Sequence, residues 1–228
     1  MRYYEELATA YIRGHADRTG VPVLPGELHN KFLSDLTPEE RSAIVDAGKV
    51  AQLKLYPFKT THSDLPRVKK VMGFLKGIPF ETLLDAGSGR GVFLFPFLTE
   101  FPWVQVTAVD LLPYRTEFLQ EMTAGGLSRL TAVHADLCAQ PFPEKSADVV
   151  TLLEVLEHIP DVESAVKAAV KTARRFVVVT VPSREDSNPE HIHLLTKERL
   201  TELFAAAGCC RLHFSGVNGH LMMTATLT

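Results

Sequence analysis

A run of glycines behind an acidic residue is the first feature of this 228-residue sequence that could do chemistry. The run reads D-x-G-x-G-x-G over residues 85–91. Glycines are needed where the backbone passes close to a ligand or adopts angles that a Cβ would forbid. A dinucleotide fingerprint would require glycine at position 92, which is valine, and no Gly-Lys-Ser/Thr follows for a phosphate loop. The carboxylate beside the loop favours a ligand with positive charge, such as an amino group or a sulfonium.

A second group of reactive side chains lies further along the chain. Glu154, Glu157 and His158 are spaced i, i+3 and i+4, which on a helical turn would bring them to one face. His191 and His193 would point to one side of the chain if their segment is extended. Either histidine would complete an oxygen and nitrogen donor set that suits a divalent cation. The same residues could equally serve proton transfer.

Alternating strands and helices are predicted to position both groups. Five apolar runs of strand length alternate with helical stretches, at residues 82–85, 104–110, 130–135, 148–153 and 176–181. Continuous apolar runs are typical of parallel strands that are buried on both faces. Two further β-rich segments, 209–216 and 220–227, flank the hairpin signal Asn218-Gly219. The pattern predicts an α/β fold with five parallel strands in a doubly wound sheet and a C-terminal antiparallel hairpin.

The first 80 residues have a different, helical pattern. Tyr3, Leu7 and Tyr11 recur at four-residue spacing. Thr37 precedes Pro38 and Glu40 in the arrangement of a helix start, and a further helix is predicted from Pro66 to about residue 77. We therefore predict an N-terminal helical cap over residues 1–80 and a second domain over residues 81–228.

Four motifs in order resemble those of class I S-adenosylmethionine (SAM)-dependent methyltransferases. Residues 85–91 resemble the first motif of this family, Asp110 ends the second predicted strand, and Asp136 follows the third. Residues 153–161 resemble the family's E-V-L-E-H-x-x-D signature. The resemblance covers residues 80–228, leaves residues 1–80 unmatched, and implies a Rossmann-like sheet.

The resemblance implies a set of cofactor-binding residues. Asp110 would bind the ribose hydroxyls, Asp136 the adenine amino group, and Leu137 would supply a backbone contact. Asp110 and Asp136 have an alternative role as helix caps, because aspartate is a favoured N-cap residue. The full predicted set is Asp85, Ala86, Gly87, Ser88, Gly89, Gly91, Asp110, Leu111, Asp136, Leu137 and Glu154.

The implied reaction is an in-line displacement on the methyl carbon, which needs a base only if the nucleophile must lose a proton. His158 is the candidate base or substrate orienter, and its alternative role is to cap a turn. His191 and His193 lie in a segment that resembles the N-P-E-H-x-x-x-x-T piece of related active-site walls, and the alternative is an exposed loop. We name His158, His191 and His193 as the catalytic candidates.

No metal is expected, because the resemblance places Glu154 on the cofactor side. The alternative is a cation held by Glu154, Glu157 and His158 with one of the later histidines. Small-RNA terminal 2′-O-methyltransferases use a similar E-x-x-E-H group, but this sequence lacks their fuller histidine-rich signature and a strongly basic surface.

Charge, cysteine content and hydropathy limit the expected partners and the expected cellular compartment. A net charge of −3 argues against nonspecific electrostatic binding of nucleic acid. Three cysteines make a poor disulfide framework and favour a reducing, cytoplasmic setting. No apolar run approaches the ~20 residues of a membrane span, and the N-terminus lacks the apolar core of a signal peptide.

The sequence thus predicts a SAM-dependent methyltransferase that acts on an oxygen, or another heteroatom, of a small molecule. The helical cap would shape or gate its pocket. An RNA or protein methyltransferase and a catalytically inactive SAM-binding regulator are the two alternatives.

Overall fold

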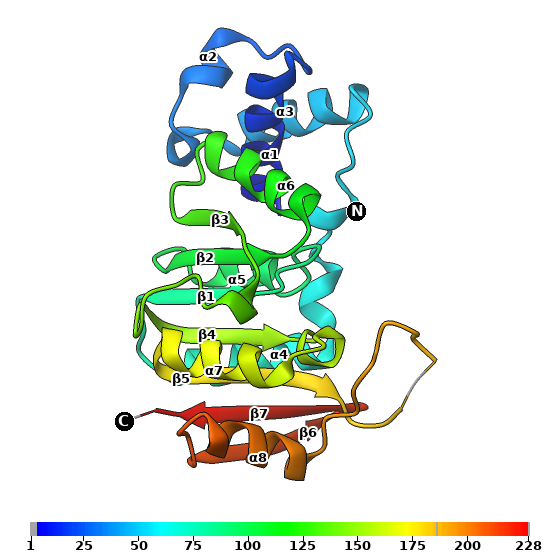
Figure 1. The fold of residues 1–228 in the computed structure, drawn as a ribbon. Helices are drawn as coiled ribbons and strands as arrows, with labels where there is room; N and C mark the ends of the chain where they lie inside the picture. Colours follow the sequence, from blue (N-terminus) through cyan, green and yellow to red (C-terminus); the bar gives the residue numbers. More distant parts are fainter. Residues whose placement is uncertain (1–3, 186, 228) are drawn as a thin grey trace.

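A computed structural model describes residues 4–185 and 187–227. They form one seven-stranded sheet with helices on both faces and a further group of helices beyond one sheet edge (Figure 1). Among the described helices, none is long and apolar enough to cross a membrane.

The strand order β3-β2-β1-β4-β5-β7-β6 confirms the predicted topology. The first five strands pair in parallel, and the final hairpin joins them through an antiparallel pairing of β7 with β5. The order reverses between β1 and β4, and in such sheets the crevice beyond the carboxyl ends of the strands is the usual ligand site. The strands are β1 (Thr82–Ala86), β2 (Gln105–Asp110), β3 (Leu130–His134), β4 (Ala147–Leu153), β5 (Ala173–Pro182), β6 (Leu212–Val217) and β7 (His220–Thr226).

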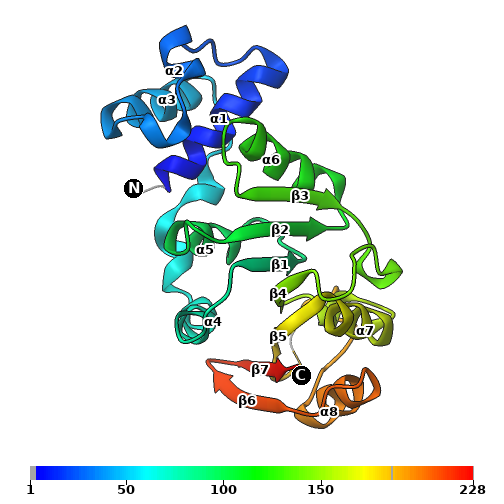
Figure 2. The same ribbon diagram turned by 90° about the vertical axis from the view of Figure 1, so that its left-hand side faces the viewer.

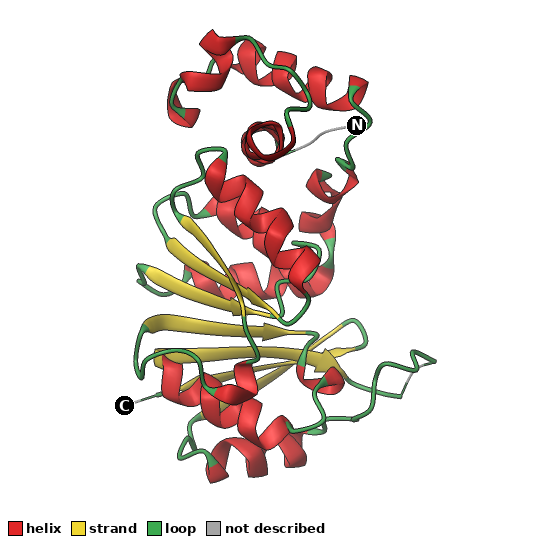
Figure 3. Cartoon of the chain, turned by 45° about the horizontal axis from the view of Figure 1, so that its top comes forward, coloured by secondary structure: helices red, strands yellow, loops and turns green. Residues whose placement is uncertain are grey.

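Helices cover both faces of the sheet. Figure 1 shows α7 and α8 in front of the sheet and α4 and α5 behind it, and Figure 3 shows the same layering by element type. Thr196 caps α8, since its side chain accepts a hydrogen bond from the Arg199 amide. The helices that cover the two faces are α4 (Pro66–Lys76), α5 (Leu94–Glu100), α6 (Pro113–Ala124), α7 (Val162–Thr172) and α8 (Lys197–Ala206).

The remaining helices lie beyond the β3 edge, where α1 packs on α6 (Figure 2). The predicted helix start at Thr37 is confirmed, with a complete capping box formed by Thr37 and Glu40. Leu7 and Tyr11 are buried on α1 as the apolar stripe indicated, whereas Tyr3 lies outside the described residues. The helices beyond this edge are α1 (Glu5–Thr19), α2 (Gly26–Asn30) and α3 (Pro38–Val50). Short 3-10 turns occur before the sheet, at η1 (Leu33–Asp35), η2 (Tyr56–Phe58) and η3 (Thr60–Asp64), and after β3 and β4, at η4 (Leu137–Ala139) and η5 (Leu156–His158).

The interface between α1 and α6 is unusually close because two glycines face it. A Cβ on Gly14 would lie 1.8 Å from the Glu121 carbonyl oxygen, and one on Gly125 would lie 1.7 Å from that of Ala10. Buried side chains of α1 and α3 belong to the same apolar cluster as those of α5 and β2. The division into a cap (1–80) and a second domain (81–228) stays a prediction.

Candidate functional site

A cavity of about 860 Å³ lies at the carboxyl ends of the parallel strands. Its wall includes the glycine loop after β1 and the ends of β2, β3, β4 and β5. The segment before residue 81 contributes Arg67, Val68 and Val71 of α4. The cavity brings together most of the predicted residues, namely Asp85, Ala86, Gly87, Ser88, Gly89, Asp110, Leu111, Asp136, Leu137, Glu154 and His158.

The glycine loop adopts backbone angles that explain its composition. Gly87, Gly89 and Gly91 have φ values of 70°, 58° and 76°. A Cβ on Gly87 would lie 2.5 Å from the side chain of Val155. Gly91 does not line the cavity, and a Cβ there would lie 2.5 Å from the ring of Phe95. Gly91 therefore serves the packing of the loop against α5.

Asp85 is a buried carboxylate at the start of this loop, with 3% of its surface exposed. The Thr151 hydroxyl donates a hydrogen bond to Oδ1 at 2.7 Å, while Oδ2 has no hydrogen-bond partner among the described residues. Burial raises the pKa of Asp85 from its ordinary value of 3.8 to about 6. A buried, half-satisfied carboxylate facing a cavity fits a cationic ligand group.

Asp110 holds the glycine loop as well as the next helix. Its Oδ2 accepts hydrogen bonds from the Gly89 amide at 2.9 Å and from Arg115 at 3.3 Å, and its Oδ1 accepts one from the Leu112 amide at 3.0 Å. Asp136 caps η4, because its Oδ1 accepts a hydrogen bond from the Cys138 amide at 2.8 Å. Both aspartates thus have capping contacts and also line the cavity.

Glu154 departs from the predicted geometry. Its φ of 59° is left-handed, a conformation that costs a non-glycine residue ~1–3 kcal/mol. Its Oε1 accepts a hydrogen bond from the Thr180 hydroxyl at 2.8 Å, and its Oε2 lies 2.9 Å from His220 Nε2. The predicted helical face of Glu154, Glu157 and His158 is therefore wrong, because the short 3-10 turn begins only at Leu156.

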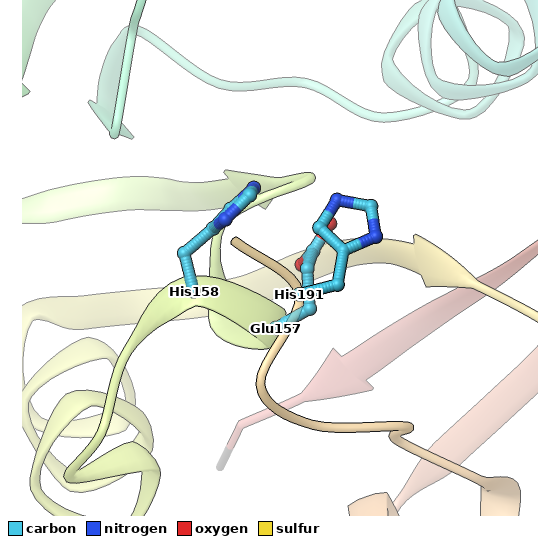
Figure 4. Close-up of side chains that lie close together, drawn as sticks. All are labelled: Glu157, His158 and His191. Atoms are coloured by element: carbon cyan, nitrogen blue, oxygen red, sulfur yellow. The ribbon is translucent and has the colours of Figure 1, made fainter. Parts of the chain in front are cut away.

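Glu157 and His158 instead lie with His191 (Figure 4). One ligand atom from each of the three residues lies within 4.8 Å of the others, and Glu157 is fully buried. The ring centroids of His158 and His191 are 4.8 Å apart in an edge-on arrangement. His158 Nδ1 donates a hydrogen bond to the Glu190 carbonyl at 2.9 Å. Two imidazoles and a carboxylate at this spacing could bind a divalent cation or move a proton.

His193 is placed apart from this cluster. Its Nε2 donates a hydrogen bond to the Ile159 carbonyl at 3.0 Å, and neither His191 nor His193 belongs to the cavity lining. The amides of Ile192 and His193 donate to the Glu157 carbonyl at 2.9 and 3.3 Å. The 191–193 segment is thereby fixed against the turn that carries His158.

Three polar residues at this site were missed from the sequence. Thr180 interrupts the apolar run 176–181 one residue before its end, so a polar residue near a strand end was an available signal. Arg67 lies on a helix that matched no motif. His220 contacts Glu154 only because β7 pairs with β5, and that pairing has no local sequence signal.

Comparison with known proteins agrees with this geometry. A family described as "Methyltransferase domain" matches residues 84–176. The ubiquinone biosynthesis O-methyltransferase of Serratia proteamaculans is 32% identical over 114 residues, which cover 49% of this chain and 46% of that protein. The chain thus spans about half the length of the curated relatives that it matches.

Two solved structures share the fold. A SAM-dependent methyltransferase from Aquifex aeolicus has a TM-score of 0.60 and 18% identity, covering 75% of this chain and 94% of that one. An O-methyltransferase family protein from Burkholderia thailandensis has a TM-score of 0.57 and 15% identity, covering 88% and 66%.

Proposed function

From the match of residues 84–176 to a methyltransferase-domain family, we propose that the chain is a class I SAM-dependent methyltransferase that transfers a methyl group to an oxygen of a small-molecule acceptor. The observation that carries the proposal is the buried, half-satisfied carboxylate of Asp85 on the cavity wall. The similarity to O-methyltransferases of ubiquinone biosynthesis supports the choice of oxygen and of a small acceptor.

The residues present fit SAM. Asp85 Oδ2 offers a buried acceptor to its ammonium group, and the glycine loop keeps side chains away from the backbone that would face it. Asp110 and Asp136 lie on the ends of β2 and β3, where the ribose and adenine would bind. When bound, SAM supplies an electrophilic methyl carbon. The proposed cofactor contacts are Asp85, Ala86, Gly87, Ser88, Gly89, Asp110, Leu111, Asp136 and Leu137, with Gly91 in a packing role and with Glu154, which the sequence resemblance included among them, assigned to the acceptor end instead.

The acceptor would lie toward β4 and β5, where His158, Glu154 and Glu190 line the cavity. Because His158 Nδ1 donates to the Glu190 carbonyl, Nε2 is the nitrogen left to accept a proton from an acceptor hydroxyl. Proton transfer by a positioned side chain accelerates such steps by ~10²–10⁴-fold. Of residues 1–80, the proposal assigns Arg67, Val68 and Val71 to the pocket.

Replacement of His158 by alanine is expected to lower kcat by about 100-fold while the affinity for S-adenosylhomocysteine (SAH) changes less than about threefold. The reason is that His158 faces the acceptor end and SAH needs no proton transfer. Single-turnover transfer and calorimetric titration would measure the two quantities. His213→Ala is the matched control, since that histidine lies exposed on β6, outside the cavity wall. Equal losses of turnover and SAH affinity would assign His158 a structural role instead.

Two experiments test the proposed function itself. Calorimetric titration with SAM tests the pocket, and no detectable heat at millimolar SAM would refute cofactor binding. Incubation with methyl-labelled SAM and either a metabolite extract or an RNA extract then tests the acceptor class. Label in the metabolite fraction supports the proposal, and label in RNA or protein favours those acceptors. Tight SAM binding without transfer to any extract would favour a binding regulator.

Treatment with EDTA is expected to leave transfer activity unchanged within about twofold, because the proposed reaction uses a protein base. The cluster of Glu157, His158 and His191 makes a metal-assisted reaction the specific alternative. Activity that is lost in EDTA and restored by magnesium or manganese would assign the cluster to that metal. A parallel SAH titration in EDTA controls for a general loss of structure.

A further inference from the structure

Two side chains from neighbouring strands hold the Glu154 carboxylate. The Thr180 hydroxyl of β5 donates to Oε1 at 2.8 Å, and His220 Nε2, at the start of β7, lies 2.9 Å from Oε2. Glu154 and Thr180 both line the cavity. The side chains of Glu154 and His220 are only 23% and 25% exposed. This carboxylate is therefore fixed from the side that faces the sheet.

Both ring nitrogens of His220 face oxygen atoms. Its Nδ1 lies 3.1 Å from the Asn218 carbonyl oxygen, and its Nε2 lies 2.9 Å from Glu154 Oε2. Contacts at both ends of the ring fix its orientation, and a hydrogen bond from Nε2 to a carboxylate is stronger than one to a neutral acceptor. The ring therefore holds the Glu154 carboxylate in a defined position.

The strand order places this pair in the acceptor half of the cavity. β4 and β5 lie on one side of β1, and β2 and β3 lie on the other. Asp110 and Asp136, the proposed nucleoside contacts, end or follow β2 and β3. Glu154 follows β4, and its left-handed backbone directs it to Thr180 and His220 instead of to the Glu157 cluster.

We propose that His220 is a positioning residue that, with Thr180, fixes Glu154 at the acceptor end, where Glu154 accepts a hydrogen bond from a second donor group of the acceptor while His158 takes the proton of the hydroxyl to be methylated. The inference rests on the proposed methyl transfer. Each carboxylate oxygen has two lone pairs, so one on each remains for the acceptor after the bonds to Thr180 and His220. The acceptor class is thereby one that presents a hydrogen-bond donor beside the hydroxyl to be methylated.

The pair itself is tested without any acceptor, by NMR of the histidine ring nitrogens. Glu154→Gln is expected to shift the ring ¹⁵N signals of His220, because Nε2 loses its carboxylate partner, and to leave those of His213 in place. His213 is the matched reference because it lies exposed on β6 of the same hairpin. Unchanged His220 signals in the Glu154→Gln protein would overturn the proposal.

The role in transfer is tested with His220→Phe and His220→Gln, with His213→Phe as control. Catechol is the probe acceptor, and the labelled metabolite fraction replaces it if catechol is not methylated. His220→Phe is expected to lower kcat/KM for the acceptor at least tenfold while SAH affinity stays within twofold. His220→Gln, which keeps a donor, should recover most of that loss.

Two results would overturn the positioning role. The first is an unchanged kcat/KM in His220→Phe protein whose melting curve shows that it is folded. The second is a loss of SAH affinity in His220→Phe as large as its loss of kcat/KM. Failure of the proposed function has a different signature, since the wild-type protein would then bind no SAH or transfer no label while the His220–Glu154 signals remain.

Discussion

Asp85→Asn is expected to weaken SAH binding by ~10–100-fold and, at the same time, to make the ligand-free protein more stable at pH 7.5. A hydrogen bond to a charged group contributes ~1.5–3 kcal/mol, which sets the size of the binding loss. The gain in stability arises because the buried carboxylate must ionise without a partner for Oδ2. The rise in its pKa from 3.8 to about 6 corresponds to ~3 kcal/mol as an upper limit.

The pH dependence has a definite sign. The pKa of Asp85 is raised in the folded protein, so the folded state keeps a proton that the unfolded chain releases between pH 3.8 and about 6. The wild-type protein should therefore lose stability relative to Asp85→Asn as the pH rises through this window, with the difference constant above it. Melting curves from pH 4 to 8 would measure the difference, which should reach ~5 °C or more. Affinity for SAH should fall in the wild-type protein below about pH 6, where Asp85 is protonated.

Asp148→Asn is the matched control at the other end of the sheet. Burial alone would raise the pKa of Asp148, but the Glu81 and Thr82 amides and Arg174 hold it below its ordinary value. This substitution should destabilise the protein at pH 7.5 and leave SAH affinity unchanged. If both substitutions shift the melting temperature in the same direction, the buried charge of Asp85 is not the cause.

Local sequence signals were sufficient to predict which residues around the glycine loop line the cavity. The glycines at 87, 89 and 91 predict left-handed backbone directly, and aspartates at strand ends reach the cavity because the ends of parallel strands meet at one edge. Strand limits were less exact. β5 begins at Ala173, three residues before the expected start, because Arg174 pairs with Asp148 while Arg175 lies over the ring of Phe176. Charged residues at the start of a strand interrupt the apolar pattern, so a prediction from that pattern begins the strand too late.

The proposed acceptor side depends on contacts that the spacing of residues does not encode. Glu154 has the i, i+3, i+4 relation to Glu157 and His158, yet its left-handed φ directs its side chain to Thr180 and His220. A glutamate carries no sign of that conformation, whereas a glycine would. The pairing of β7 with β5 brings His220 next to Glu154. His191 lies next to His158 because the amides of the two residues that follow His191 donate hydrogen bonds to the Glu157 carbonyl.

Gly14→Ala is expected to destabilise the protein by at least ~3 kcal/mol and to lower its melting temperature by ~10 °C. The added methyl would lie 1.8 Å from the Glu121 carbonyl oxygen, so α1 and α6 must separate along their whole contact. Backbone atoms cannot move aside as a flexible side chain could. The two helices therefore pack as a fixed unit, which argues that α1 anchors the N-terminal segment and that any gating of the pocket belongs to α4.

Gly73→Ala is the control, and it is expected to change the stability in the opposite direction. Gly73 also lies within a helix, but a Cβ there meets no atom within 4 Å, so the substitution should stabilise by up to ~1 kcal/mol through helix propensity. SAH affinity of the folded Gly14→Ala protein should match that of wild type, because the cavity lining from residues 1–80 comes from α4 and not from α1. Equal melting temperatures for the two variants would contradict the close packing of α1 on α6. A selective loss of SAH affinity in Gly14→Ala would instead make α1 part of the binding site.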